Sequence, residues 1–375
     1  RVKRKLIIFV LSVVVLTGLV SAYLWQDYQK FSRQPLPLKD DAVFQLVRGT
    51  GFMELQKQLT QQGWITQPFY FKLLARHSGY GRKLKAGEYE IPAGTTPLKL
   101  LEILASGKSI QHRFTIIEGT RFKELRAQLL ADQRLTHTLA EQSDAKVLEA
   151  IEAEYVHPEG LFLAETYQFQ RGDTDLSILK RANKLLQSRL SEAWKSRADK
   201  VSYKQPYEAL IMASIIEKET GQPKERPQIA GVFTRRLAKG MRLQTDPTVI
   251  YGMGDGYNGN ITRADLRRPT EYNTYVIKGL PPTPIAMVGV EAIQAALNPA
   301  DGKSLYFVAK GDGTHAFSAT LNEHNRAVRK YQLQRRKNYR SSPECVSLCP
   351  RRCRVSLLRL KVPKVAVRVP ISLLS

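Results

Sequence analysis

The longest apolar stretch of the chain lies near its start, where the residues from Leu6 to Trp25 carry no charge. A helix of this length spans a hydrocarbon core of about 30 Å, so the pattern predicts a single transmembrane helix. The basic residues 1–5 precede it, and the positive-inside rule then places the N-terminus in the cytoplasm and the body across the inner (plasma) membrane. A signal peptide cleaved after Ala22 is the alternative, but the run is long for one, and a retained anchor is favoured. Both interpretations place the body in the periplasm or outside the cell.

Beyond the anchor, a pattern of strand, glycine turn and helix occurs twice. Residues 49–59 and 119–129 are identical at seven of eleven positions. Each copy follows a strand-like run and begins a helix whose apolar residues recur three and four positions apart.

Residues 42–110, around the first copy, are predicted to form a small domain. A helical pattern at 68–77, a strand-like run at 86–91 and a further helical pattern at 96–106 complete it. The order of strand, helix, helix and strand resembles a LysM-like module, a βααβ fold used on glycans. A plain α+β packing domain without a ligand is compatible with the same pattern.

Residues 26–41 are predicted to be a linker that connects the membrane helix to this domain. Their second half is polar and contains two prolines.

Residues 111–340 are predicted to form a larger mixed domain, which makes the fold class α+β. Residues 241–284 are rich in Gly, Pro, Asn and Thr with little periodicity, which indicates a long ordered loop region of the kind that carries function. The tail, residues 341–375, changes abruptly in composition and is interpreted as disordered or foreign. Helical patterns occur at 144–155, 174–197, 207–220, 227–239, 288–297 and 321–338, and strand-like runs end at 169 and 310.

The net charge of +24 is unevenly distributed: residues 1–5 carry +4 and the tail carries +6, which leaves +14 for the body. A basic body favours an anionic polymer or surface. Because the body is exported, nucleic acid is not an expected partner, and carboxylate-rich cell wall is.

Several other chemistries lack their motifs. All three cysteines (Cys345, Cys349 and Cys353) lie in the tail, which excludes a disulfide framework for the body. Pro350 and the lack of a nearby His argue against a metal site there, so neither metal nor cofactor is expected. The sequence has no H-E-x-x-H, G-x-S-x-G or P-loop motif, and among its histidines only His315 and His324 share a neighbourhood.

One helix, residues 207–220, carries the best candidate for acid–base chemistry. It is nearly all apolar up to Glu217, and the residues three, four and seven positions earlier share the face of that carboxyl group. Lost hydration and the negative end of the helix both raise its pKa towards the value that a general acid needs. Glu219 points to another face and is predicted to be solvated or paired with Lys218 or Lys224. The alternative is that Glu217 only caps the helix or pairs at its end.

Five segments, in a fixed order, carry a family resemblance. Together they resemble the signature of the MltG (YceG-like) endolytic murein transglycosylases, over the chain from the anchor to about residue 338. The resemblance departs at Ala164, where the family has proline. The segments are EGLFLAETY (159–167), ASIIEKET (213–220), LQTDPTVIYG (243–252), YNTY (272–275) and GLPP (279–282).

The resemblance implies an endolytic peptidoglycan lytic transglycosylase, a lyase that cleaves the MurNAc–GlcNAc β-1,4 bond of nascent strands and leaves 1,6-anhydro-MurNAc ends. It implies Glu217 as the catalytic glutamate, which protonates the leaving oxygen and then takes the proton of the sugar's own C6 hydroxyl. Such an enzyme would end glycan elongation. Its partners would be peptidoglycan glycan strands and membrane lipid, with peptidoglycan synthases nearby.

An oxocarbenium-like transition state also needs oriented polar groups. A hydrolytic muramidase is the alternative enzyme, with Asp246 or Glu165 as a second carboxylate. A non-enzymatic alternative is an anchored glycan-binding scaffold that uses the LysM-like module alone. The candidate substrate-binding residues are Gln244, Thr245, Asp246, Tyr272, Asn273, Tyr275 and Glu165.

Overall fold

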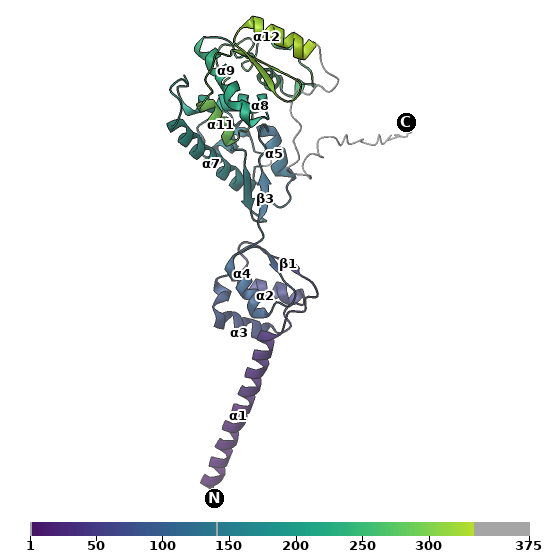
Figure 1. Cartoon of the computed structure of the whole chain (residues 1–375). Helices are drawn as coiled ribbons and strands as arrows, with labels where there is room; N and C mark the ends of the chain where they lie inside the picture. The colour runs from purple at the N-terminus through teal and green to yellow at the C-terminus, as the bar shows by residue number, and fades with distance from the viewer. Residues whose placement is uncertain (1, 140–141, 334–375) are drawn as a thin grey trace, which may run out of the picture.

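The computed structural model describes residues 2–139 and 142–333. The first element is a long helix, α1 (Val2–Arg33), of 32 residues. Its apolar segment is exposed along its whole length, and the helix is long and apolar enough to cross a membrane. In Figure 1 it leads into a small body, which is followed by a larger one. The expected single apolar N-terminal helix is therefore present, and the α+β class is confirmed.

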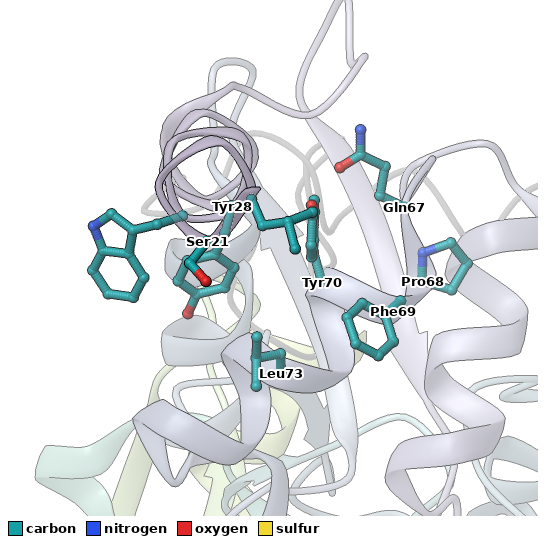
Figure 2. Close-up of a pocket in the computed structure, with 9 residues that line it drawn as sticks. Ser21, Tyr28, Gln67, Pro68, Phe69, Tyr70 and Leu73 are labelled. Atoms are coloured by element: carbon teal, nitrogen blue, oxygen red, sulfur yellow. The ribbon is translucent and has the colours of Figure 1, made fainter. Parts of the chain in front are cut away.

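The predicted linker, residues 26–41, is not a free spacer. α1 continues without a break through Arg33, and Tyr28, Phe31 and Leu36 are buried in the core of the small body. The ring of Tyr28 meets that of Tyr70 edge-on, with the ring centroids 5.9 Å apart (Figure 2). Aromatic residues that continue the apolar face of a helix are buried wherever a partner surface is available, and here the small body provides it.

The small body has the predicted order of strand, helix, helix and strand. Strands β1 and β2 pair antiparallel with Ala42 opposite Ile91, and alternate residues such as Phe44 and Leu46 point into the core. The likeness to a LysM module stays a prediction, and so do the domain boundaries. The elements are β1 (Ala42–Leu46), α2 (Phe52–Gln61), α3 (Pro68–Ser78), the 3-10 turn Tyr80–Arg82, β2 (Gly87–Ile91) and α4 (Pro97–Ser106).

The larger body is built around one buried helix, α8 (Pro206–Glu219), against which α7, α9, α10 and α11 pack. Two short antiparallel sheets flank this helical core: β3 pairs with β4, and β5 pairs with β6. The other elements are β3 (His112–Thr115), α5 (Phe122–Ala131), α6 (Asp144–Ala150), β4 (Thr166–Phe169), α7 (Asp175–Lys195), α9 (Arg226–Ala238), α10 (Asp246–Met253), α11 (Val290–Leu297), β5 (Tyr306–Ala309), β6 (His315–Ser318), α12 (Leu321–Val328), the 3-10 turns Pro223–Glu225, Gly254–Gly256 and Asp265–Arg267, and the π turn Arg329–Leu333.

The internal repeat is confirmed as a structural unit. In the first copy β1 leads into α2, and in the second β3 leads into α5. The region 241–284 was wrongly predicted to be loop throughout, because it contains α10. Asp246 and Pro247 occupy the first turn of α10, where a carboxylate and a missing N–H are both favourable.

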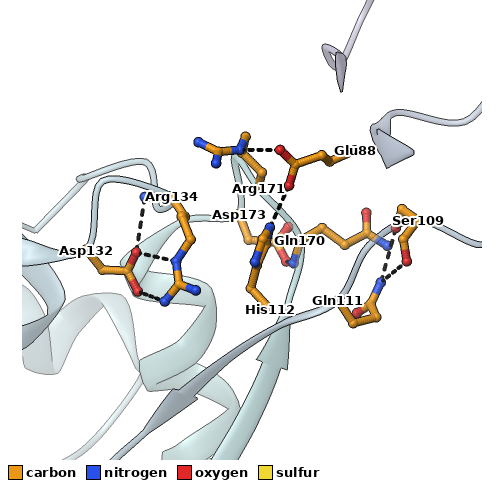
Figure 3. A network of polar contacts seen from close by, with 9 residues as sticks. All are labelled: Glu88, Ser109, Gln111, His112, Asp132, Arg134, Gln170, Arg171 and Asp173. Atoms are coloured by element: carbon orange, nitrogen blue, oxygen red, sulfur yellow. Dashed lines mark hydrogen bonds and ion pairs between the residues drawn. The ribbon is translucent and has the colours of Figure 1, made fainter. Parts of the chain in front are cut away.

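Polar contacts join the two bodies (Figure 3). The carboxylate of Glu88 on β2 accepts hydrogen bonds from His112 Nε2 at 2.6 Å and from Arg171 Nε at 2.8 Å. A second ion pair joins Arg48 to Asp173 at 3.0 Å. Glu88 is almost wholly buried, so its two partners hold it more firmly than an exposed ion pair would.

The predicted tail and its cysteines lie outside the described residues, as does the end of the predicted helix 321–338.

Candidate active site

The end of α8 carries two carboxyl groups that face different surroundings. The helix begins at Pro206, whose missing N–H is unneeded in the first turn, and it ends at Glu219. Every residue from Ala209 to Glu217 is buried, so α8 has no solvent face along that stretch. Glu217 and Glu219, two positions apart, therefore lie on two different buried sides of the same helix end.

Glu217 is fixed by two donors. Its Oε1 accepts from Arg226 Nη2 at 2.8 Å, and its Oε2 accepts from the backbone N–H of Gly289 at 3.0 Å. The side chain of Glu217 is 2% exposed. Burial raises its pKa, while the N–H of Gly289 and the guanidinium of Arg226 act in the opposite direction.

Arg226 gathers two more carboxylates around the same point. Its Nη2 also donates to Glu118 at 3.1 Å, and its Nη1 donates to Glu291. An added Cβ at Gly289 would stand 2.1 Å from Glu118 Oε1, so a larger residue there would push the Glu118 carboxylate out of its present position beside Arg226. Arg226 begins α9 and Gly289 precedes α11, so this cluster ties the end of α8 to both neighbouring helices.

Glu219 has neither partner predicted for it. Its Oε1 accepts a hydrogen bond from the hydroxyl of Thr245, and the carboxyl group lines a cavity of about 540 Å³. Burial raises the pKa of Glu219 to about 7; the hydroxyl of Thr245 works against this, and the charge of Asp246 adds to it. Glu219 is half-buried beside the cavity, and its hydrogen-bond partner is Thr245 in place of the predicted lysine.

The cavity beside Glu219 brings together most of the predicted loop residues. Four of them line it: Gln244, Thr245, Asp246 and Tyr275. The remaining lining residues are Arg236, Leu243, Tyr306, Phe307, Val308, Ala309, His315, Leu321, His324 and Gln332.

The backbone that presents these residues is held by buried hydroxyl groups. Thr245 N–H donates to Thr274 Oγ1 at 3.0 Å, and Thr248 Oγ1 lies 2.8 Å from Thr274 Oγ1. Gln244 has a φ of 51°, a left-handed conformation that non-glycine residues rarely adopt. Such strain persists only where the surroundings enforce it, and it is concentrated at functional sites.

Asp246 and Tyr275 form a pair at the cavity wall. The hydroxyl of Tyr275 donates to Asp246 Oδ1 at 2.7 Å. Burial and the neighbouring carboxylate raise the pKa of Tyr275, so it stays a neutral donor. The pair presents a carboxylate acceptor and a hydroxyl group to the cavity.

The other three predicted binding residues have local structural partners. Tyr272 bonds through its hydroxyl to Thr283 at 2.9 Å. Asn273 is buried, and its Nδ2 donates to the carbonyls of Asp265, Leu266 and Arg268. Glu165 is exposed and accepts from the N–H of Thr166, next to it in the chain. None of these three residues is among those that line the cavity.

Two histidines of the cavity were not predicted as site residues. His315 Nδ1 lies 2.7 Å from Glu225 Oε2, and its backbone N–H donates to Glu225 Oε1 at 2.9 Å. His324 stacks on Tyr306, with ring centroids 5.2 Å apart. The one available signal was that these two histidines lie near each other in the sequence. Among the described residues, no three His, Cys, Asp or Glu side chains are grouped so as to hold a metal ion.

A carboxyl group whose pKa burial raises to about 7, in a polar cavity lined also by Arg236, Asp246 and Tyr275, is a candidate acid–base site. The family follows from comparison with known proteins. The chain belongs to the YceG-like family, whose model matches residues 44–330.

Two relatives bear the name endolytic murein transglycosylase. That of Bacillus subtilis (strain 168) is 33% identical in an alignment of length 269 that covers 66% of this chain and 73% of the relative. That of Streptococcus pneumoniae (strain D39) is 26% identical in an alignment of length 363 that covers 86% of this chain. The chain spans 65% of the length of this streptococcal relative.

A YceG-like protein of Listeria monocytogenes has a crystal structure with 28% sequence identity to this chain. It matches with a TM-score of 0.48, over 77% of this chain and 99% of that protein.

Proposed function

We propose that this protein is a membrane-anchored lytic transglycosylase of peptidoglycan, a lyase, with Glu219 as its general acid and base. Its family and the names of its relatives support the activity and the substrate. The observation that carries the choice of residue is the position of Glu219: it lines the polar cavity and has a pKa of about 7.

The proposed reaction cleaves the β-1,4 bond between MurNAc and GlcNAc without water. Protonated Glu219 gives its proton to the glycosidic oxygen as the bond from C1 to that oxygen breaks. The resulting carboxylate takes the proton of the C6 hydroxyl, and O6 bonds to C1 to leave a 1,6-anhydro end. Glu219 is then protonated again, so one carboxyl group serves both steps.

Thr245 orients the acid. Its hydroxyl donates to Glu219 Oε1, which leaves Oε2 to carry the proton. Gln244, Asp246 and Tyr275 supply polar atoms for sugar hydroxyls, and His315, held by Glu225, lines the same cavity. A pKa near 7 keeps a large fraction of Glu219 protonated at neutral pH, as a general acid requires.

Glu217, which the family resemblance indicates as the acid, is the alternative proposal for that role. Both its oxygens are occupied by donors, and it is not among the residues that line the cavity. We assign it the role of a positioning residue, which holds α8, α9 and α11 together behind Glu219.

The hydrolytic alternative needs a second carboxylate near the scissile bond. Asp246 lines the cavity, but its Oδ1 accepts the hydroxyl of Tyr275, which suits binding and orientation better than nucleophilic attack. Glu165 is exposed and lies outside the cavity lining. These contacts favour the single-acid reaction.

The remaining parts of the proposal concern location and binding. The helix α1 anchors the chain with its N-terminus in the cytoplasm, so that the body acts outside the membrane on nascent strands, near peptidoglycan synthases. We also propose that residues 42–110 form a LysM-like glycan-binding domain and that residues 111–340 form the catalytic domain.

Product analysis tests the activity. Purified uncrosslinked glycan strands are incubated with the full chain in detergent, and the products are weighed by mass spectrometry. Anhydro ends, lighter by one water than hydrolysed ends, are the expected result. Reducing ends would support the muramidase instead, and intact strands with retained binding would support the scaffold.

A further inference from the structure

An apolar groove lies where the anchor helix meets the small body (Figure 2). It measures about 670 Å³ and opens to the outside of the protein. Two elements line it: α1 contributes Ser21, Leu24, Trp25 and Tyr28, and the start of α3 with the residue before it contributes Gln67, Pro68, Phe69, Tyr70 and Leu73.

The small body exposes large apolar side chains at this groove. Phe69 is 74% exposed and Leu73 is 44% exposed, although both belong to a helix whose other face is packed in the core. Trp25 across the groove is 62% exposed. A contiguous apolar patch of this kind marks a surface that binds another apolar partner, such as a lipid or a second protein surface.

The position of the groove along the apolar run of α1 is fixed. Tyr28 and Phe31 are buried in the core of the small body, and α1 is unbroken, so α3 cannot move freely along the anchor. Ser21 and Leu24 belong to the apolar run itself, and at about 1.5 Å per residue Ser21 lies roughly 6 Å inside the end of the run at Trp25. Phe69 and Leu73 line the same groove and therefore reach the level of the membrane.

We propose that this groove receives an acyl chain of a membrane lipid and that the start of α3 lies in the membrane interface. The inference rests on the proposed anchoring by α1. A lipid acyl chain is the expected occupant because the groove is continuous with the apolar surface of α1. Any lipid that surrounds Leu24 therefore also contacts Phe69 and Leu73. Aromatic residues at this level (Trp25, Tyr28 and Tyr70) match the belt that such residues form at membrane surfaces. The small body then rests on the lipid surface instead of standing away from it on a linker.

Lipid-depth quenching tests the proposal in the full chain. The three cysteines of the tail are replaced by serine, and single cysteines are placed at Phe69→Cys and Leu73→Cys for an environment-sensitive fluorophore. Val43→Cys is the matched control, since Val43 is 61% exposed and belongs to β1, which Figure 1 shows on the side of the small body away from the anchor. Each labelled protein is reconstituted in phosphatidylglycerol–phosphatidylethanolamine vesicles with and without a nitroxide on the acyl chain.

We expect quenching at positions 69 and 73 to exceed that at position 43 at least about twofold, as for side chains at the boundary of head groups and acyl chains. Equal quenching at all three positions would overturn the proposal. Disulfide-linked dimers of the unlabelled Phe69→Cys variant, without quenching of the labelled one, would assign the groove to a second copy of the chain and overturn it as well. Recovery of the body in the soluble fraction, cleaved after Ala22, would remove the anchor and the lipid groove together.

Failure of this inference is distinguishable from failure of the proposed activity. Glycan cleavage measured on the same labelled proteins reports on the catalytic cavity, which contains none of the substituted residues. Cleavage with unquenched probes would overturn the lipid groove alone, and quenched probes without any cleavage would overturn the proposed activity alone.

Discussion

The two carboxyl groups at the end of α8 are of the same type and stand two positions apart, yet their surroundings differ. Glu217 meets a guanidinium and a backbone N–H, with further carboxylates beyond them. Glu219 accepts a hydrogen bond from one hydroxyl and borders an open polar cavity, which Arg236 and Asp246 also line. Burial raises the pKa of both carboxyl groups. At Glu217 a direct ion pair with Arg226 opposes that rise and suits a structural role, whereas Glu219 has a hydroxyl as its hydrogen-bond partner and faces the cavity. Burial is common to both groups, so the difference between them lies in the partner and in access to the cavity.

The largest expected effect separates the two residues by activity. Glu219→Gln keeps the size of the side chain but cannot transfer a proton, and we expect glycan cleavage to fall by at least about 10²-fold. The release of anhydro ends from purified strands measures it, with Glu192→Gln on the exposed face of α7 as the control. Activity near that of the wild type in Glu219→Gln, together with loss of activity in a folded Glu217→Gln protein, would reverse the assignment and restore Glu217 as the acid.

The second expected effect concerns stability. Glu217→Gln leaves the buried Arg226 with only the more exposed Glu118 and Glu291, whose side chains are 47% and 64% exposed. We expect the free energy of unfolding to fall by about 2 kcal/mol, measured by urea denaturation. Glu192→Gln, an exposed pair with Arg189, should change it by less than about 0.5 kcal/mol. Equal stability of the two variants would mean that Arg226 does not depend on Glu217.

The third effect is a pH dependence that belongs to Glu219. Its pKa is raised from 4.5 to about 7 on folding, so the folded state binds this proton more tightly than the unfolded state. The stability contributed by this proton is complete below the unfolded pKa and is lost as the pH rises towards 7. Glu219→Gln should therefore become more stable relative to the wild type between pH 5 and pH 8, by roughly 2–3 kcal/mol. Glu159, whose pKa is also raised to about 7, is present in both proteins and cancels.

The same proton controls the rate. Because the acid must be protonated to act, kcat/KM should fall as the pH rises through about 7. A profile that stays flat up to pH 9 would contradict Glu219 as the acid.

The smallest expected effect concerns Asp246. Asp246→Asn can still accept the hydroxyl of Tyr275, so we expect a substantial fraction of activity to remain and the products to keep their anhydro ends. If this variant abolished cleavage in a folded protein while wild-type products carried reducing ends, the hydrolase would replace the single-acid mechanism.

The sequence predicted the elements that have strong periodicity of their own. The apolar run of α1, the repeated strand and helix and the buried α8 all follow from local patterns. Of the seven candidate binding residues, Gln244, Thr245, Asp246 and Tyr275 line one cavity. The sequence treated α8 as a helix with one buried face, whereas every residue from Ala209 to Glu217 is buried. That burial depends on helices and loops distant in sequence.

Short elements were harder to predict for a similar reason. The strand β6, which carries His315, has four residues and is defined by its pairing with β5. The partners of Tyr28 and Phe31 lie in α3 and elsewhere in the small body, so nothing within residues 26–41 signals that this segment is packed. When the packing or pairing of a segment depends on residues distant in sequence, the hydrophobic periodicity of the segment does not reveal it.

The contacts of Glu88 fix the larger body relative to the small body and to α1. α1 is stiff up to the small body, and Glu88 fastens that body to the larger one through His112 and Arg171. With α1 in a membrane, the cavity beside Glu219 stands at a height above the lipid that the protein itself dictates. On the proposed function, a glycan strand would then be cut only where its path through the wall crosses that height.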